Sequence, residues 1–492
     1  MLYVIIAIVA VVVAFALVLI IRASRFKPLP AAQEKLPDVP MDGKGAVKRL
    51  CEAVTYRTVT YADEDKVDWT QFEGLRGWLE SAYPAVHKTL EREVVSRASL
   101  LYKWTGKDPS LKPFGLLAHM DVVPVEEHTV GDWTHPPFDG YADDDAVWGR
   151  GSNDMKNQLV ALFEAVETLI GEGFEPERDV YICLGHNEEV PMGDKSGART
   201  MAKLLEERGV HMEFILDEGG AVMEEPPFGL STPVAMIGLA EKGFVDFGIS
   251  VLDAGGHSSE PPKHTALGKL AKVITFIERS PMKQKLISPV TKTFDAIGRY
   301  MGFSMRLILA NQWLFKPLLK SALAKEKQTN AMTRTTMAAT MCEASPASNV
   351  LPQRASVTIN SRILPGETMD DVKKHIERVV AKSGVSVEVA LLRGSEPVPE
   401  RTTAWAYDAI LRFLPAISDG IVAAPYLVMG GTDSREYVPV TDEIYRFYPF
   451  IVNKKELAAM HATDERIRIS SLIGAVKFNY HFIKGAASRV DS

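Results

Sequence analysis

The segment Phe114-Gly-Leu-Leu-Ala118 leads directly into His119-Met-Asp121. The first five residues form an uncharged apolar run, which predicts a buried β-strand. Because His119 and Asp121 are two residues apart at the end of this strand, their side chains point to the same side of the chain. A histidine placed in this way can bind a metal ion while the aspartate holds its imidazole in one tautomer. This strand end is therefore the first part of a candidate metal site.

Two more predicted strands end in acidic residues. Asp179-Val-Tyr-Ile-Cys-Leu184 leads to Glu188-Glu189, and Glu213-Phe-Ile-Leu216 leads to Asp217-Glu218. Helical patterns separate the strands, which is the alternation of an α/β sheet. Ligands of such sheets gather at the carboxyl ends of the strands. Adjacent carboxylates are costly there unless a cation compensates their charge.

A glycine-rich turn and a late histidine complete the candidate ligands. In Gly149-Arg-Gly-Ser-Asn-Asp154 the glycines allow a tight turn, which places Asp154 at the start of a helix that extends to about Leu169. An aspartate at this position can also act simply as the helix N-cap. The full candidate set is His119, Asp154, Glu189, Glu218 and His461.

The donor types in this set indicate hydrolytic chemistry. Two imidazoles and three carboxylates suit a pair of zinc ions that share one carboxylate, and manganese or cobalt would also suit them. Two such ions can polarise a carbonyl group and lower the pKa of water. Glu188 lies next to a candidate ligand and is not needed as one, so it is the natural general base.

The composition is that of a folded protein with more than one domain. The chain has 492 residues, 46% hydrophobic and 24% charged residues, and a net charge of −7. This charge, together with the lack of a lysine- or arginine-rich block in the sequence, argues against a nucleic-acid partner. Cys51, Cys183 and Cys342 lie far apart and form no metal or redox motif.

The amino-terminal segment predicts a membrane anchor. Leu2 to Ile21 carries no charge, and about 20 apolar residues span a bilayer as a helix. A cleaved signal peptide is the alternative, but it usually has a basic start and a shorter apolar core of about 7–15 residues. We therefore expect an uncleaved single-pass anchor. Arg22, Arg25 and Lys27 favour a cytoplasmic catalytic body, whereas the resemblance described below implies the other side, so the side is left open.

The patterns divide the chain into an anchor, a linker and two domains. In the inserted domain, strands and helices alternate as β-α-β-β-α-β, which is the ferredoxin-like order. A mostly apolar helical insertion at 280–334 interrupts this order. Its apolar residues are explained by simple packing, or by contact with an acyl chain or a dimer partner. The predicted parts are the anchor (1–22), a proline-containing linker (23–42), the catalytic domain in two pieces (43–241 and 395–485) and the inserted domain (242–394).

The order of the motifs resembles a known family. His-x-Asp at 119–121, Gly-Arg-Gly-Ser-x-Asp-Met-Lys at 149–156, Glu-Glu at 188–189, Asp-Glu-Gly at 217–219 and the late His461 are similar to the zinc metallopeptidase and amidohydrolase family of aminoacylases, acetylornithine deacetylases and carboxypeptidases S and G. The resemblance covers about residues 45–485. The segments Gly255–Pro262, Gly431–Arg435 and Ile444–Pro449 most resemble carboxypeptidase S and the N-fatty-acyl-amino-acid synthases/hydrolases.

This resemblance implies a fold and a pair of metal ions. The fold would be a zinc-peptidase catalytic domain, with a mixed sheet flanked by helices, and an inserted ferredoxin-like lid or dimerisation domain. Each subunit would bind two zinc ions. Asp217 is the alternative to Glu218 as a ligand. The implied ligands are His119, Asp154 and Glu218 for one ion, and Asp154, Glu189 and His461 for the other.

The resemblance also implies roles for residues outside the metal ligands. Asp121 would orient His119, and Glu188 would be the base. His257 would cross a dimer interface to stabilise the oxyanion. Asn349 and Arg362 would hold the oxyanion and the substrate carboxylate, for which an arginine fork is suited. Backbone contacts to the substrate would come from Gly430 and Gly431.

We therefore expect a membrane-anchored, homodimeric zinc hydrolase. It would cleave the amide bond of N-acyl amino acids, including N-fatty-acyl amino acids. Catalysis speeds both directions of a reaction, so the sequence leaves the direction, hydrolysis or synthesis, open. The first alternative is a carboxypeptidase S-like enzyme that acts on dipeptides or oligopeptides. The second is a zinc-binding homologue without catalytic activity, against which the presence of Glu188 and every ligand type argues.

Overall fold

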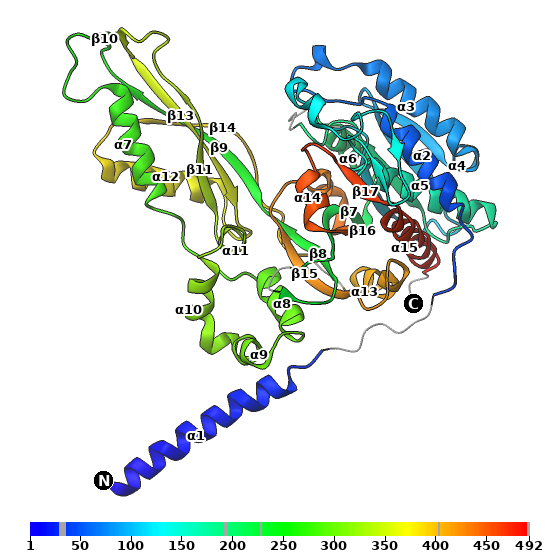
Figure 1. Cartoon of the computed structure of the whole chain (residues 1–492), viewed down its shortest axis with the longest axis horizontal. Helices are drawn as coiled ribbons and strands as arrows, with labels where there is room; N and C mark the ends of the chain where they lie inside the picture. The colour runs from blue at the N-terminus through cyan, green and yellow to red at the C-terminus, as the bar shows by residue number, and fades with distance from the viewer. Residues whose placement is uncertain (29–35, 191–194, 227–228, 402–403, 490–492) are drawn as a thin grey trace. The chain divides into compact units, whose positions relative to one another are not determined.

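The computed structural model describes residues 1–28, 36–190, 195–226, 229–401 and 404–489. These residues form two compact units (Figure 1). The first unit comprises Met1–Lys27, Ala240–Glu400 and Tyr426–Gly431. The second unit comprises Pro28–Leu239, Arg401–Pro425 and Thr432–Ser492.

The second unit is built on a mixed eight-stranded sheet. Neighbouring strands among β6, β3, β7 and β16 run parallel, whereas β1 and β2 are antiparallel to each other and β2 is antiparallel to β6. This confirms the predicted mixed sheet. The strand order is β1 (Glu91–Val95), β2 (Ser99–Trp104), β6 (Val180–Gly185), β3 (Phe114–His119), β7 (Met212–Met223), β16 (Thr441–Val452), β8 (Val234–Glu241) and β15 (Val422–Val428).

Helices cover both faces of this sheet, which explains its continuous apolar strands. Every residue of β3 and β6 is buried. Leu116 faces the larger core, whereas Leu117 faces the smaller core under α6. The helices of this unit are α2 (Gly43–Thr55), α3 (Trp69–Ala82), α4 (Pro84–Thr89), α5 (Lys156–Gly171), α6 (Gly197–Glu207), α13 (Ala404–Phe413), α14 (Lys454–Ala459) and α15 (Ile469–Ala487).

One predicted strand end is wrong. We expected the third strand to end at Leu216, but β7 continues through Asp217 and Glu218 to Met223. The pairing with β16 shifts between Asp217 and Ala221, so residues 218–220 form an irregular stretch inside the strand. Gly219 has a φ of 119° there, a conformation that glycine adopts readily. The strand therefore bends at its acidic residues instead of ending at them.

The first unit contains the predicted β-α-β-β-α-β order. Its antiparallel sheet packs two helices on one face, around a core that includes Phe247, Leu270 and Ile376. Its role as a lid or dimerisation domain stays a prediction. The sheet order is β11 (Thr336–Glu343), β13 (Arg354–Ile363), β9 (Gly243–Leu252) and β14 (Glu388–Ser395), with helices α7 (Ala266–Glu278) and α12 (Met369–Ser383).

Two short sheets complete the strands. One pairs β10 (Gly256–His257) with β12 (Val350–Leu351) in the first unit. The other has the order β17 (Arg466–Arg468), β5 (Ala146–Trp148) and β4 (Tyr141–Ala142) in the second unit. This second sheet joins the segment after His461 to the segment before Asp154, so it brings together two parts of the chain that both carry candidate ligands.

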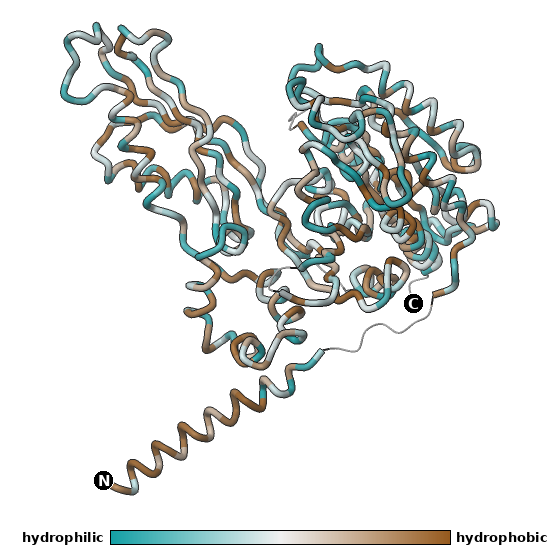
Figure 2. Tube along the Cα trace, in the orientation of Figure 1, coloured by the Kyte–Doolittle hydropathy of each residue, from teal (hydrophilic) through white to brown (hydrophobic). Residues whose placement is uncertain are grey.

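The helical insertion and the amino-terminal helix belong to the first unit. Helix α1 (Leu2–Arg25) is the one helix in the described ranges that is long and apolar enough to cross a membrane. Figure 2 shows it as hydrophobic over most of its length. The insertion contains α8 (Ser288–Gly298), α9 (Phe303–Leu309), α10 (Gln312–Leu323) and α11 (Lys327–Met332).

The predicted extended linker at 23–42 is partly wrong. Helix α1 continues to Arg25, because Ala23 is fully buried and Phe26 nearly so. At the other end of the predicted linker, Val39 lies in the main core of the second unit. Residues 29–35 lie outside the described residues. The apolar residues at both ends of this segment therefore pack against protein, which its proline content did not predict.

Candidate metal centre

The five predicted ligands come from five different segments of the second unit. His119 ends β3, and Glu189 follows β6. Asp154 lies in the turn before α5, and His461 lies in the loop after α14. Glu218 projects from the irregular stretch of β7. Parallel strands β6, β3 and β7 thus deliver their ligands to the same edge, as expected for a parallel sheet.

Asp154 lies between the two histidines. Its Oδ1 is 3.1 Å from His119 Nε2, and its Oδ2 is 3.0 Å from His461 Nε2. Glu218 Oε1 is 3.7 Å from His119 Nε2, whereas Glu189 Oε1 is 3.1 Å from His461 Nε2. One oxygen of Asp154 therefore belongs to each half of the cluster, which is the arrangement that a bridging carboxylate requires.

The electrostatics of the cluster fit a cationic occupant. Burial raises the pKa of Glu218 well above its ordinary value, and the neighbouring Asp154 and Asp217 raise it further. Burial also raises the pKa of Glu189. Hydrogen bonds to Asp154 and Glu189 raise the pKa of His461 to about 10. Carboxylates that are packed this closely need positive charge, and the mixed imidazole and carboxylate donors suit zinc, manganese or cobalt.

Asp121 connects His119 to the Glu188-Glu189 segment. The main-chain oxygen of Asp121 accepts a hydrogen bond from His119 Nδ1 at 3.0 Å, whereas its Oδ1 lies at 3.5 Å from the same nitrogen. Because a carbonyl oxygen can only accept, this bond places the proton on Nδ1 and leaves Nε2 free to bind a metal ion. The Asp121 carboxylate accepts the main-chain N–H of Glu188 at 3.1 Å and of Glu189 at 3.2 Å. It also accepts the hydroxyl of Thr60 at 2.7 Å.

Glu188 lies beside the first half of the cluster. Its carboxylate, a carboxylate oxygen of Glu218 and a ring nitrogen of His119 lie within 4.8 Å of one another. Burial raises the pKa of Glu188 well above its ordinary value, and Glu218 raises it further. A carboxylate in such a position can take up a proton and release it again, as a general base must.

The geometry supports Glu218 over Asp217 as the ligand. The Oδ2 atom of the buried Asp217 accepts the main-chain N–H of Ser434 at 2.8 Å. The carboxylate of Glu218 faces His119 instead. The choice of Glu218 stays a prediction, with this arrangement as its support.

The sequence analysis missed Glu465. Its buried Oε1 accepts the main-chain N–H of Gly151 at 2.9 Å, of Asn153 at 3.0 Å and of Asp154 at 3.1 Å. Its Oε2 pairs with Arg150. Glu465 thus holds the turn that carries Asp154. The only sequence signal was an acidic residue four positions after His461, and no local pattern connects it to a turn more than 300 residues earlier.

The remaining predicted site residues belong to the first unit. Exposed His257 accepts a hydrogen bond from the hydroxyl of Ser259 at 2.8 Å. The main-chain N–H of Ser258 donates to the Asn349 carbonyl oxygen at 3.1 Å, so His257 and Asn349 lie on joined loops. Arg362 lies near the other end of β13, where its guanidinium is 6.0 Å from the ring of Phe244. Gly430 and Gly431 follow β15. The roles of these five residues stay predictions.

Comparison with known proteins decides the family. The sequence pattern of peptidase family M20/M25/M40 matches residues 115–485, which include all five candidate ligands. The chain belongs to this family. As a member of family M20 it is a metallopeptidase-type hydrolase of amide or peptide bonds, which confirms the predicted family and enzyme class.

Relatives within family M20 carry two kinds of name. The chain is 36% identical to probable carboxypeptidase S-like 2 from Dictyostelium discoideum, over 89% of this chain and 84% of the relative. It is 35% identical to N-fatty-acyl-amino acid synthase/hydrolase PM20D1 from Mus musculus, over 88% of this chain and 86% of the relative. It is 31% identical to carboxypeptidase S from Saccharomyces cerevisiae, over 89% of this chain and 83% of the relative.

Solved structures share the M20 fold. The M20 family metallo-carboxypeptidase Sso-CP2 from Sulfolobus solfataricus superimposes with a TM-score of 0.64 at 18% identity, over 89% of this chain and 98% of that chain. Human carnosine dipeptidase 1 gives a TM-score of 0.59 at 16% identity, over 90% of this chain and 96% of that chain. At this identity the likeness concerns the fold alone.

Proposed function

We propose that this protein is a dinuclear zinc hydrolase that releases free amino acids from N-acyl amino acids, including N-fatty-acyl amino acids. One observation carries the dinuclear part: the two oxygens of Asp154 lie at 3.1 and 3.0 Å from the Nε2 atoms of two different histidines. His119, Asp154 and Glu218 would hold one ion, and Asp154, Glu189 and His461 the other. The raised pKa values of Glu218 and Glu189 support this assignment.

The chain's own residues would perform the proton transfers. When bound, the two zinc ions would polarise the scissile carbonyl group and lower the pKa of water. Glu188 would take the proton from the attacking water, hold it on its carboxylate and then deliver it to the nitrogen of the leaving amine. Asp121 would keep Glu188 in place through the hydrogen bond to its main-chain N–H. The C–N bond breaks, and the products are a carboxylic acid and a free amino acid.

The choice of acyl group rests on two observations. A relative named N-fatty-acyl-amino acid synthase/hydrolase matches the chain over 88% of its length. The chain also carries an apolar amino-terminal helix and an insertion with exposed apolar side chains. The competing proposal is a carboxypeptidase that acts on peptides, because relatives with that name are 36% and 31% identical to the chain, against 35% for the synthase/hydrolase.

Hydrolysis of a matched panel separates these proposals. The full-length, zinc-loaded protein in detergent would be given one amino acid that carries an acetyl, an oleoyl or an aminoacyl group. We expect the highest kcat/KM for the oleoyl compound, because a relative that is 35% identical over 88% of this chain is named for N-fatty-acyl amino acids. A preference for the free dipeptide would establish the carboxypeptidase instead. Failure to hydrolyse any compound despite a full zinc content would establish a non-catalytic homologue.

The arrangement within the first unit supports a cross-dimer role for His257. β13 pairs Arg354 with Leu252 near the His257 loop, and it pairs Arg362 with Phe244 at its other end. The eight residue steps between these pairs span about 27 Å, which exceeds the size of one amino acid. His257 and Arg362 of one subunit therefore cannot both contact the same amino-acid moiety. We propose that His257 and Asn349 serve the site of a second subunit in a homodimer.

Mixing two inactive variants tests the homodimer. Glu188→Ala and His257→Ala should each lose activity and retain zinc. An equal mixture, dissociated and reassociated, should regain about a quarter of the wild-type activity, because half of the dimers are mixed and each has one complete site. No recovery would place His257 in the site of its own subunit or outside catalysis.

We also propose that α1 anchors the protein in a membrane as a single-pass helix. Its 24 residues carry no charge before Arg22, and they are long enough to cross a bilayer. The side on which the second unit lies is left open. The intact mass of the protein extracted from membranes tests the anchor, because a cleaved signal peptide would reduce the mass by the mass of this segment.

A further inference from the structure

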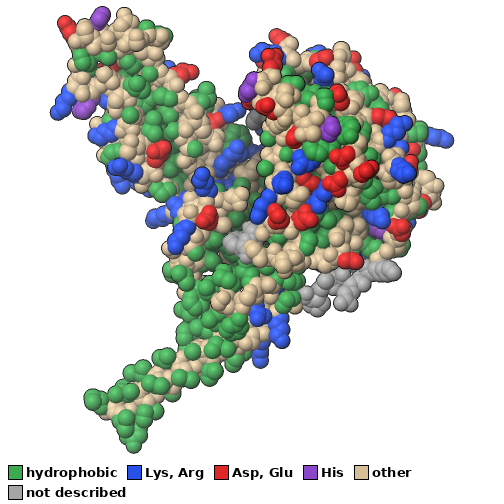
Figure 3. Space-filling model, viewed as in Figure 1, with side chains coloured by type: hydrophobic (Ala, Val, Ile, Leu, Met, Phe, Trp, Pro, Cys, Tyr) green, Lys and Arg blue, Asp and Glu red, His purple; other side chains and the backbone are tan. Residues whose placement is uncertain are grey.

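The helices of the insertion expose large apolar side chains beside α1. On α10, 59% of Trp313 and 55% of Leu318 are solvent-exposed, and Leu314 is also exposed. On the adjacent α9, Phe303 and Met305 are exposed as well. Figure 3 shows hydrophobic side chains gathered over α1 and over the part of the first unit from which it projects. We call the exposed side chains of Phe303, Met305, Trp313, Leu314 and Leu318 the insertion patch.

Specific polar contacts hold α1 against the insertion. The guanidinium of Arg22 donates two hydrogen bonds to the carbonyl oxygen of Ala310, at 3.1 and 3.3 Å. The side-chain amide of Asn311 donates to the carbonyl oxygen of Leu19 at 3.2 Å. Each bond uses a polar group of the short segment between α9 and α10. This segment is therefore fixed at the carboxyl-terminal end of α1.

Aromatic and close backbone packing completes this attachment. Phe26 lies 4.7 Å below the guanidinium of Arg299, which also donates to the Lys27 carbonyl oxygen. A Cβ atom added at Gly298 would lie 2.7 Å from Leu309 and 3.0 Å from the ring of Phe26, so the glycine permits the approach. The end of α1 is thus packed into the insertion and is not simply connected to it by a loose chain.

The attachment extends into the apolar part of α1. The rings of Phe15 and Trp313 meet edge to face with their centroids 6.1 Å apart. Phe15 precedes Arg22 by seven residues, which corresponds to about 10 Å along a helix. If Arg22 lies at the level of the lipid headgroups, Trp313 therefore lies about 10 Å below that level, beside the apolar part of the span.

We infer that the insertion patch is a membrane-docking surface whose occupant is the lipid bilayer. This inference rests on the proposed anchor. Because α1 is fixed to the insertion, a bilayer that surrounds α1 must also meet α9 and α10. Tryptophan, phenylalanine and leucine are typical of helix faces that are buried about 5–10 Å into the boundary between headgroups and acyl chains. The protein is thereby held at the membrane by a broad surface in addition to one helix.

Charge distribution supports a bilayer with anionic lipids. Residues 299–325 contain no aspartate or glutamate. Basic residues near an apolar surface attract anionic headgroups, and the end of α1 adds Arg22, Arg25 and Lys27. The basic residues of the insertion in this range are Arg306, Lys316, Lys320 and Lys325, together with Arg299, which is paired with Asp295 at 3.2 Å.

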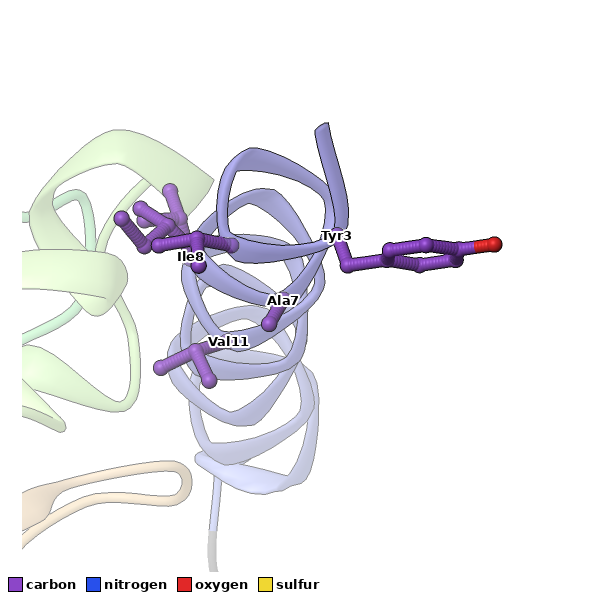
Figure 4. Close-up of a pocket in the computed structure, with 6 residues that line it drawn as sticks. Tyr3, Ala7, Ile8 and Val11 are labelled. Atoms are coloured by element: carbon purple, nitrogen blue, oxygen red, sulfur yellow. The ribbon is translucent and has the colours of Figure 1, made fainter. Parts of the chain in front are cut away.

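The surroundings of α1 favour lipid over a protein occupant. Figure 4 shows Tyr3, Ala7, Ile8 and Val11 projecting outward from α1, where they line an apolar surface of the helix itself. Nearly all apolar side chains of α1 are exposed. A helix that is hydrophobic all round needs apolar surroundings on every side, as a bilayer provides. The contact between Phe15 and Trp313 places the insertion patch directly beside α1, so the same apolar surroundings would cover both.

Fluorescence quenching by brominated lipids tests the inference in the full-length protein. The protein would be reconstituted in nanodiscs that contain phosphatidylcholine and phosphatidylserine, with or without bromine on the acyl chains. Trp313 is the one tryptophan of the first unit, and the other six belong to the second unit. We expect bromolipids to reduce tryptophan emission in the wild type, and Trp313→Phe to remove most of this reduction. Equal quenching of the wild type and Trp313→Phe would overturn the inference, and so would the absence of quenching.

A pair of charge substitutions gives a second test. Leu318→Glu places a negative charge in the insertion patch, whereas Leu391→Glu places one on exposed β14 of the same unit. We expect Leu318→Glu to reduce the quenching of Trp313 and Leu391→Glu to leave it unchanged. If Leu318→Glu instead leaves quenching unchanged and converts a dimer to a monomer, the occupant is a second copy of the chain. If it raises KM for the oleoyl compound alone, the occupant is the acyl chain of the substrate.

Two controls separate this inference from the proposals on which it rests. Hydrolysis of a water-soluble acetyl amino acid, measured on the same samples, reports the enzyme function independently of quenching. Activity without quenching overturns the docking surface alone, and quenching without activity overturns the proposed function alone. Intact mass shows whether α1 is retained. If α1 is retained but Trp313 is not quenched, the result supports the proposed anchor and overturns the docking surface.

Discussion

The carboxylate of Asp121 accepts a hydrogen bond from the main-chain N–H of Glu188 at 3.1 Å. The same residue accepts the Nδ1 hydrogen of His119 through its carbonyl oxygen at 3.0 Å. Asp121 therefore contacts both a proposed metal ligand and the proposed base, but through different atoms. The carboxylate also accepts the main-chain N–H of Glu189, a proposed ligand, at 3.2 Å, so a substitution of the carboxylate tests the Glu188-Glu189 segment and leaves the main-chain contact to His119 in place.

We predict that Asp121→Asn lowers kcat more than it lowers zinc affinity. The substitution keeps the main-chain oxygen that holds His119, whereas an amide cannot accept the N–H groups of both Glu188 and Glu189. A loss of about 10- to 100-fold in kcat is expected, which is typical for a residue that supports a metal site. Steady-state kinetics and zinc analysis check this. Thr60→Val removes one hydrogen bond from the same carboxylate and should have a smaller effect. An equal loss of zinc and of kcat would contradict the prediction.

Glu188→Gln should retain zinc and lose turnover. The amide keeps the size of the side chain and cannot take a proton from water, so a loss of about 10²- to 10⁴-fold in kcat is expected. Zinc content measured after dialysis should match that of the wild type. Glu189→Gln is the matched control, because it changes a proposed ligand and should lower zinc affinity as well. Near-normal turnover of Glu188→Gln would remove Glu188 from the role of base.

Glu465→Gln should weaken zinc binding without altering any proposed ligand. The substitution breaks the buried pair with Arg150, and loss of one partner of such a pair typically costs about 3–5 kcal/mol of stability. The amide has a single oxygen, which cannot accept both from the three N–H groups of the turn and from Arg150, so the turn that carries Asp154 should be displaced and affinity for both ions should fall. Competition with a chelator measures this. As a control, His461→Ala should lower the affinity for one of the two ions only. Unchanged zinc affinity in Glu465→Gln would show that the turn does not need Glu465 to keep its position.

The free energy of unfolding should depend on pH because of the buried side chain of Lys242. Burial lowers the pKa of Lys242 to about 8, and its Nζ donates to the carbonyl oxygens of Ala331 and Arg334 at 2.9 and 2.8 Å. An unfolded lysine keeps its proton up to about pH 10.4, so between these values the unfolded state binds more protons and stability rises with pH.

The matched variant for this measurement is Lys242→Met, which lacks the titrating group. The difference in free energy of unfolding between the wild type and Lys242→Met should grow in favour of the wild type from pH 8 to about pH 10. Denaturant unfolding at several pH values measures this difference. Parallel curves for the two proteins would show that Lys242 keeps its ordinary pKa in the folded state.

The sequence by itself determined the fold class and the residue types of the site. One apolar run leads into His119, and another precedes Glu188. These local patterns predict strands that end in candidate metal-binding or catalytic side chains. The order of the motifs indicated the family, which the match over residues 115–485 confirmed. Such features lie within a few neighbouring residues, so a sequence pattern can carry them.

Only the tertiary structure decided how those residues meet. The irregular stretch in β7 directs Glu218 toward His119, and it depends on pairing with β16, more than 200 residues away. Glu465 reaches the turn of Asp154 across 311 positions, and α1 meets α10 across nearly 300. Contacts between distant segments depend on packing in three dimensions, for which periodicity along the chain holds no signal.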